Sequence, residues 1–367
     1  MDSNSYEFSA IRGIQAGTAY YVIMCALKLV PRLFSFDDDA IPPDLRAQRV
    51  LNRARVPAIA RYITENPGEY ILSSLCASVD GEVEFEPAVA EGPLRSVGRL
   101  RVSMNATILI NDGQHRRAAI EEAIRDRPYL GEETISVVLF ADRGLVRSQQ
   151  MFADLNLHAV RPSKSIGVLY DHRDPLASLA RQVIARVPTF RDITELEKTT
   201  ISNRSLKFFT LSSIYQATAE LIGKARGESI SEVEESLAIQ FWNEVAARMP
   251  DWLRVAARQV SAAELRQDYV HAHGIALHAL AIAGTQAIAL YPDSWPERLD
   301  GLTTVDWARS NRTLWEGRAL VGGRINKSRN HILLVANVIL HALNLPLTAE
   351  GERVEALHAG PEILAHA

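Results

Sequence analysis

Residues 108–117 read Ile-Leu-Ile-Asn-Asp-Gly-Gln-His-Arg-Arg. The apolar start predicts a buried strand, and Gly113 permits the left-handed backbone of a tight turn. The apolar residues that follow recur at helical spacing: Ala118, Ile120, Ala123 and Ile124. We therefore predict a strand that turns at Asp112-Gly113 directly into a helix, within a mixed α/β fold.

Such a turn is suited to holding a phosphate. The first N–H groups of a helix have no partner within it, and the helix dipole favours an anion there. Residues 114–117 add amide, imidazole and guanidinium donors within one turn, and an arginine can hold two phosphate oxygens at once. The alternative is an ordinary surface helix, capped by Asp112, with its arginines paired to Glu121 or Glu122.

Bulk properties are those of an ordinary folded protein of about two domains. Hydrophobic residues make up 47% of the 367 residues, which is enough for a core of normal size. The net charge of −4 means that any nucleic-acid contact must come from a local basic patch. Two distant cysteines, Cys25 and Cys76, favour a reducing compartment, and we expect the cytoplasm. Residues 275–291 predict a buried helix and no membrane contact.

Secondary-structure patterns divide the chain into two halves. In the first half they predict strands at Tyr20–Val30, Leu100–Asn111 and Thr134–Phe140, and helices at Asp44–Ala54, Val56–Tyr62 and Leu145–Leu155. Asp80-Gly81 predicts a tight hairpin joining Ile71–Val79 to Glu82–Pro87.

The second half is nearly all helical from about Leu206 onward. Two capping-box patterns, Ser231-x-x-Glu234 and Ser261-x-x-Glu264, precede apolar-periodic stretches. We place a soft boundary near Thr194–Arg204, which gives domains of residues 1–195 and 196–367.

The motif Asp112-Gly113-Gln114-His115-Arg116 spells DGQHR, and with it the chain resembles the DndB family of DNA sulfur-modification proteins. The likeness is weakest in the last fifty residues and covers several other segments: Leu27–Phe36, Gln48–Tyr62, Leu72–Glu84, Thr134–Phe140, Met151–Asn156 and Arg161–Lys164. The resemblance implies a negative regulator of the phosphorothioate-modification genes. Such a regulator binds double-stranded DNA of their promoter region as a homo-oligomer, alongside other DNA sulfur-modification proteins.

At superfamily level the turn resembles that of ParB and sulfiredoxin proteins. Gly113 to Arg116 align with G-E-R-R of ParB and G-C-H-R of sulfiredoxins. This implies a ParB/sulfiredoxin-like α/β (α+β) N-terminal domain, followed by a mostly α-helical C-terminal domain. Gln114 replaces the sulfiredoxin cysteine, so we expect no sulfiredoxin activity. A second nucleotide-contacting motif of ParB resembles the segment around Asn156, whose alternative role is a helix C-cap.

Candidate site residues follow from the turn and from the basic residues around it. A phosphate or nucleotide would contact Asp112, Gly113, Gln114, His115, Arg116 and Asn156. DNA would contact Arg46, Arg49, Arg53, Arg55, Arg117, Arg161 and Lys164. Between residues 44 and 61 the sequence has five arginines and a single acidic residue, Asp44, which makes a phosphate-binding patch plausible. The family resemblance places this segment beside the turn. The alternative for these arginines is a solvated helix face.

Two competing functions stay open. The first is a nucleotide-hydrolysing or DNA-nicking enzyme with catalytic Asp112, His115 and Arg116, which would use a nucleoside triphosphate with magnesium. Otherwise no cofactor is expected. The second is an assembly partner of the sulfur-modification machinery.

Three other features carry weaker signals. His271, His273 and His278 have poor spacing for metal ligands and are interpreted as buried or half-buried, so no metal site is predicted. Ser202–Lys207 and Gly322–Arg329 have side chains that suit contact with a DNA backbone, but a polar connection is the favoured interpretation of both.

Overall fold

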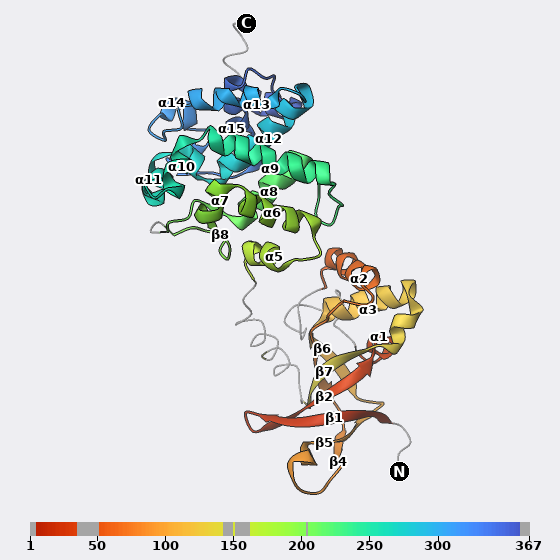
Figure 1. Cartoon of the computed structure of the whole chain (residues 1–367). Coiled ribbons are helices and arrows are strands. Elements are labelled where there is room, and N and C mark those ends of the chain that lie inside the picture. The colour runs from red at the N-terminus through yellow and green to blue at the C-terminus, as the bar shows by residue number, and fades with distance from the viewer. Residues whose placement is uncertain (1–4, 35–50, 142–149, 151–161, 203–204, 360–367) are drawn as a thin grey trace. The chain divides into compact units, whose positions relative to one another are not determined.

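The computed structural model describes residues 5–34, 51–141, 150, 162–202 and 205–359 (Figure 1). By internal contacts the chain divides into an N-terminal unit, residues 1–160, and a C-terminal unit, residues 161–367. This division falls earlier than the boundary expected near Thr194–Arg204. The reason is that residues 179–193 already pack into the hydrophobic core of the C-terminal unit.

The N-terminal unit contains one mixed sheet. Its strands are β1 Ser5–Gln15, β2 Thr18–Ala26, β3 Leu75–Asp80, β4 Val83–Pro87, β5 Val97–Ser103, β6 Thr107–Asp112 and β7 Thr134–Ala141. They lie in the order β4-β5-β1-β2-β7-β3-β6, and neighbours are antiparallel except the parallel pair β3 and β7. The described helices are α1 Val30–Leu33, α2 Val56–Glu65 and α3 Gln114–Asp126, with 3-10 turns at Leu27–Leu29, Arg53–Arg55, Pro93–Ser96 and Pro128–Glu132.

Alternation along the strands separates a buried face from a solvated one. In β5, Leu100 and Val102 are buried, whereas Arg99 and Arg101 alternate with them and pair with Glu7 of β1. The buried face shares one hydrophobic core with α2 and α3, which lie side by side (Figure 1). The helices that carry the DGQHR motif and its neighbouring segment are therefore fixed by the same core.

Several predicted elements are confirmed. The strand expected at Thr134–Phe140 is β7, the helix expected at Val56–Tyr62 is α2, and β6 turns directly into α3. The strand expected at Tyr20–Val30 ends earlier, because β2 gives way to a 3-10 turn at Leu27. The helix expected at Leu145–Leu155 lies outside the described residues except for position 150.

Two strand predictions were wrong. Asp80-Gly81 does not close a hairpin, because β3 pairs with β6 and β7 while β4 pairs with β5. Residues 75–79 are all buried, and a strand buried on both faces belongs between two neighbours. Leu100–Asn111 is also two strands, β5 and β6, which pair with different partners on either side of the break. Of the helix expected at Asp44–Ala54, the described part is a loop and the start of a 3-10 turn.

The C-terminal unit is mostly helical, as predicted. Its helices are α5 Lys164–Tyr170, α6 Pro175–Arg186, α7 Pro188–Ile193, α8 Leu211–Ile222, α9 Glu232–Ala247, α10 Pro250–Ala256, α11 Ala262–Asp268, α12 Gly274–Leu290, α13 Trp295–Arg298, α14 Arg312–Trp315, α15 Arg329–Ala342 and α16 Ala349–Ala359, with 3-10 turns at Val270–Ala272 and Leu299–Thr304. Two short ladders join β8 Thr194–Glu195 to β9 Phe209–Thr210 and β10 Leu320–Val321 to β11 Arg324–Ile325.

Helix α12 is the centre of this unit. It is apolar nearly all round, as a helix buried on all sides must be, and it packs against α8 and α15. The capping box at Ser231 and Glu234 is present, and Ser261 caps α11. Among the described helices, none is both long and apolar enough to cross a membrane.

Candidate functional site

The turn between β6 and α3 requires glycine for two reasons. Gly113 has φ +108° and ψ +13°, in the left-handed region. A Cβ at this position would lie 2.4 Å from Leu75 Cδ2 on the neighbouring strand β3. The first helical hydrogen bond follows at once, since Arg117 N donates to Gly113 O at 2.9 Å. Asp112 does not cap α3, because Gly113 holds the N-cap position without a side-chain bond.

Arg116 forms the centre of the turn. Its Nη2 donates to Asp112 Oδ2 at 2.8 Å and its Nη1 donates to the Ser73 hydroxyl. Its Nε is buried and has no hydrogen-bond partner within the described residues. The Asp112 side chain is 52% exposed and that of Arg116 only 19%. The charge of Arg116 is thus compensated by a carboxylate that solvent or a ligand can reach.

Arg117 points into the fold. Its Nε donates to Phe34 O at 3.1 Å, its Nη2 to Pro31 O at 2.5 Å and its Nη1 to Glu121 Oε2 at 2.5 Å. The side chain is 13% exposed. The pairing with Glu121, considered as the alternative for this residue, is therefore present. These bonds tie α3 to the chain around α1, so the geometry gives Arg117 a positioning role.

His115 connects the turn to the segment that precedes α2. Its Nε2 accepts a hydrogen bond from the Asn52 backbone N–H at 3.2 Å, which assigns the proton of the neutral ring to Nδ1. Gln114 is buried at the first position of α3, and Asn111 is buried within β6, where Ser78 Oγ donates to its Oδ1. The motif residues therefore fix the local structure as well as presenting donors.

An excess of positive charge lies beside the motif rather than in it. Asn52 caps the 3-10 turn that carries Arg53 and Arg55, and both arginines are exposed, as is Arg61 on α2. In the part of the chain that the structure describes, none of the three has a hydrogen-bond or ion-pair partner for its guanidinium. The bond from Asn52 to His115 places the start of this segment against α3.

The structure places the other predicted residues unevenly. Arg46, Arg49, Asn156 and Arg161 lie outside the described residues. Lys164 is exposed at the start of α5, which Ser163 caps, and it belongs to the C-terminal unit. Ser73, Leu75 and Asn52 contact the turn but were not singled out. The signal available for them was the family resemblance of the two segments in which they lie.

Cys76 lies opposite Asp112 in the β3–β6 ladder, beside a register shift. Burial and the nearby Asp112 carboxylate, partly offset by Arg116, raise the pKa of its thiol to about 12. The thiol is therefore protonated at neutral pH. Across the described ranges, no group of three or more His, Cys, Asp or Glu side chains is arranged to hold a metal ion.

A comparison with family models finds a match over most of the chain. The model described as DndB, DNA-sulfur modification-associated, matches residues 8–346, which include the turn, the arginine segment and most of the helical unit. No curated protein and no solved structure matches the chain significantly.

Proposed function

Because this chain belongs to the DndB family, described as DNA-sulfur modification-associated, we propose that it is a DNA-binding negative regulator of a phosphorothioate-modification gene cluster. The proposal includes a ParB/sulfiredoxin-like fold for the N-terminal unit and a cytoplasmic, oligomeric protein. It also includes promoter DNA and other sulfur-modification proteins as partners. The mixed sheet with its strand-to-helix turn supports the proposed fold of the N-terminal unit.

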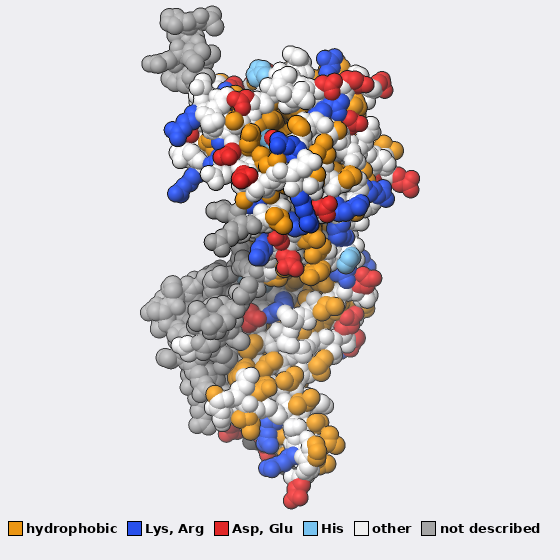
Figure 2. Space-filling model, turned by 60° about the vertical axis from the view of Figure 1, so that its left-hand side comes forward, with side chains coloured by type: hydrophobic (Ala, Val, Ile, Leu, Met, Phe, Trp, Pro, Cys, Tyr) orange, Lys and Arg blue, Asp and Glu red, His pale blue; other side chains and the backbone are white. Residues whose placement is uncertain are grey.

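The observation that carries DNA binding is the exposed arginine segment beside the DGQHR turn. Arg53, Arg55 and Arg61 bring three positive charges to one short stretch, and the Asn52–His115 bond anchors its start. On the face shown in Figure 2, basic and acidic side chains are interspersed. With a net charge of −4, the molecule as a whole does not attract DNA, so a local excess must supply the phosphate contacts.

In this proposal the turn adds a phosphate contact that is regulated by Asp112. Arg116 is held by Asp112 and Ser73, so a backbone phosphate or a nucleotide must replace the exposed carboxylate as its partner. The helix start of α3 lies at the same place and favours an anion. The turn therefore tunes binding, whereas Arg53 and Arg55 supply the main attraction.

The test is binding of the full chain to its own upstream DNA, measured by fluorescence anisotropy over a salt series. Each phosphate contact contributes about −0.9 to the slope of log affinity against log salt. We expect Arg53→Ala and Arg55→Ala each to remove about one phosphate contact, which makes the slope less steep by about 0.9. The double variant should lose about two contacts. Arg95→Ala, which removes an exposed arginine from a 3-10 turn elsewhere in the N-terminal unit, should leave the slope unchanged.

If Arg95→Ala reduces the salt slope as much as Arg53→Ala does, only the net charge matters, and the proposed DNA-binding patch is contradicted. The same preparations test the enzyme alternative through phosphate release from ATP with magnesium, with and without DNA. Release above background that disappears in Asp112→Ala would favour the enzyme over the regulator.

A further inference from the structure

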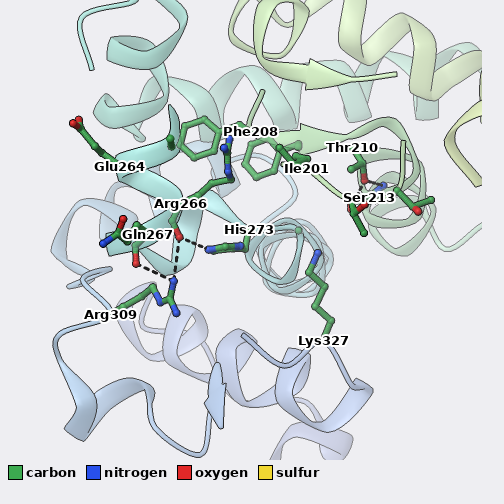
Figure 3. A pocket seen from close by; sticks show the side chains of 15 residues that line it. Ile201, Phe208, Thr210, Ser213, Glu264, Arg266, Gln267, His273, Arg309 and Lys327 are labelled. Atoms are coloured by element: carbon green, nitrogen blue, oxygen red, sulfur yellow. Dashed lines mark hydrogen bonds between the residues drawn. The ribbon is translucent and has the colours of Figure 1, made fainter. Parts of the chain in front are cut away.

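The C-terminal unit contains a second basic site that the DGQHR motif does not include. A cavity of about 580 Å³ is lined by polar and cationic side chains from several segments, among them Thr210, Ser213, Arg266, His273, Arg309 and Lys327 (Figure 3). This volume lies within the range of roughly 300–1,000 Å³ that is typical of small-molecule sites.

The two arginines of the cavity are held by backbone oxygens. Arg266 is 8% exposed and donates to the carbonyl oxygens of Ser202, Ser205 and Lys207. Arg309 donates to the carbonyl oxygens of Arg266 and Gln267 and to that of Gly323. Carbonyl groups orient a guanidinium but do not neutralise it. Within the described residues, Arg309 is therefore fixed at the cavity without the carboxylate partner that Arg116 has at the turn.

Lys327 adds a third positive charge with no compensation. Burial lowers the pKa of its ammonium, although the residue as a whole stays exposed. Within the described ranges, neither Lys327 nor Arg309 has a carboxylate within ion-pair distance, and the ammonium has no hydrogen-bond partner. A partly desolvated ammonium without a counter-charge is costly, so the arrangement is suited to an anion that pairs with it.

The start of α12 opens at the same place. Gly274 begins this 17-residue helix after His273, whose side chain makes no capping bond. A Cβ on Gly274 would lie 2.7 Å from Ser213 Oγ and 3.2 Å from Lys327 Nζ. The absence of a side chain at Gly274 thus lets the Ser213 hydroxyl and the Lys327 ammonium approach the helix start closely. Three kinds of donor around one point match the several oxygens of a phosphate.

His273 does not add charge. Burial, together with repulsion from Lys327, Arg309 and Arg266, lowers its pKa to about 4, against a smaller opposing effect of the hydrogen bond to the Arg266 backbone. Its Nε2 is 2.7 Å from Arg266 O, so the neutral ring donates there. The acidic side chain lining the cavity is Glu264, which is exposed and points away from the group in Figure 3. The net charge of the side chains that line the cavity is therefore positive.

We propose that this cavity binds a small phosphate-bearing ligand of nucleotide size, held by Lys327, Ser213 and the start of α12. The limited volume of this half-open cavity favours a small molecule over a DNA backbone, which binds along extended surfaces. Such a site makes the C-terminal unit a sensor of a small phosphorylated effector. The proposal is separate from DNA binding through the arginine segment.

The test uses isothermal titration of the full chain with three probes, namely inorganic pyrophosphate, AMP and ADP, without magnesium. We expect at least one to bind, and Lys327→Met to weaken it at least about tenfold, since a hydrogen bond to a charged group is lost. Methionine follows the lysine side chain as far as Cε, lacks the ammonium and needs no partner, so denaturation should show no loss of stability. Gly274→Ala, which fills the space beside Lys327, should weaken binding similarly.

The control is Arg353→Gln, which removes one positive charge from the exposed surface of α16 and should bind the probe as the parent does. No binding of any probe at millimolar concentration would overturn the proposal, and so would parental affinity in Lys327→Met. A short DNA duplex is titrated in parallel. If Lys327→Met weakens only the duplex, the cavity contacts a DNA phosphate and the small-ligand proposal fails.

Discussion

The DGQHR turn and the C-terminal cavity differ in the partners of their positively charged side chains. At the turn, Arg116 pairs with Asp112 at the end of β6, and Arg117 pairs with Glu121 on the same helix, α3. At the cavity, the partners of the Arg309 guanidinium among the described residues are backbone carbonyls. The motif that is conspicuous in the sequence is thus nearly neutral, whereas the cavity, which has no motif, keeps its charge.

This difference distinguishes arginines that hold the local structure from cations that are available to bind a ligand. A ligand that binds an arginine already paired with a carboxylate must first break that ion pair, so the turn is suited to a regulated contact. An uncompensated cation in a partly closed space favours any anion that reaches it. A comparison of the two sites therefore tests which charges hold the fold and which are available to partners.

The largest effect should come from the backbone of the turn. Gly113→Ala should destabilise the N-terminal unit by about 2–5 kcal/mol, the sum of a left-handed backbone and of overpacking against Leu75. Urea denaturation followed by circular dichroism measures this. Gly17→Ala is the matched control, since its φ is +74° with no atom within 4 Å of the added Cβ. It should cost only about 1–2 kcal/mol. Equal losses would contradict the packing role of Gly113.

The next effect tests whether Arg117 positions α3. Arg117→Ala leaves the carbonyl oxygens of Pro31 and Phe34 without this donor and should cost about 2–4 kcal/mol of unfolding free energy. Arg125→Ala, at an exposed position of the same helix, should change stability by less than about 0.5 kcal/mol. If the Arg117 variant is as stable as the Arg125 variant, Arg117 is available for DNA and the contrast between the two sites weakens.

The third effect is a pH dependence confined to the C-terminal unit. Burial lowers the pKa of His273 and of His278 to about 4, below the ordinary 6.5. The unfolded chain therefore binds protons between pH 6.5 and 4 that the folded chain does not. Stability is complete above pH 6.5 and falls toward pH 4, by roughly 2–3 kcal/mol for each histidine.

Denaturation at pH 7.5 and at pH 4.5 measures this loss. His278→Gln should remove one histidine's share of the pH dependence. His341→Gln, at an exposed position on α15, should not. Parallel pH profiles for the parent and the His278 variant would refute this origin of acid sensitivity.

The smallest effect on stability should be the most informative for function. Asp112→Asn removes the i,i+4 pair of Arg116 and should change stability by less than about 0.5 kcal/mol. DNA affinity should nevertheless rise several-fold, because the carboxylate no longer competes with a phosphate. Glu121→Gln releases no guanidinium, since Arg117 keeps its backbone partners, and should leave the affinity unchanged. A rise in both variants would indicate a general charge effect.

Much of the N-terminal fold was predictable because its signals are local. The apolar run into Gly113 and the helical spacing after it specify the β6–α3 turn, and the β-branched residues of 134–140 specify β7. The pairing of strands was not predictable in this way. Asp80-Gly81 has the sequence of a hairpin turn, yet β3 and β4 take different neighbours because β3 must be buried on both sides.

The two candidate sites also differ in how far their residues lie apart in the sequence. The turn could be predicted because its donors are consecutive in the sequence. The cavity could not, because Ser213, Arg266 and Lys327 come from segments far apart and meet only through the packing around α12. Family resemblance helped with Asn52 and Ser73, which contact the turn from distant positions, but it gave no residue roles there.

The position of β7 in the sheet has a consequence for synthesis on the ribosome. Without β7, the strand order separates into β4-β5-β1-β2 and β3-β6, each with an open edge where β7 belongs. A nascent chain therefore exposes β2 and β3 as templates for pairing with other chains until residue 141 has emerged. The DGQHR helix is complete by residue 126, so the DGQHR turn is synthesised before the sheet that supports it can close.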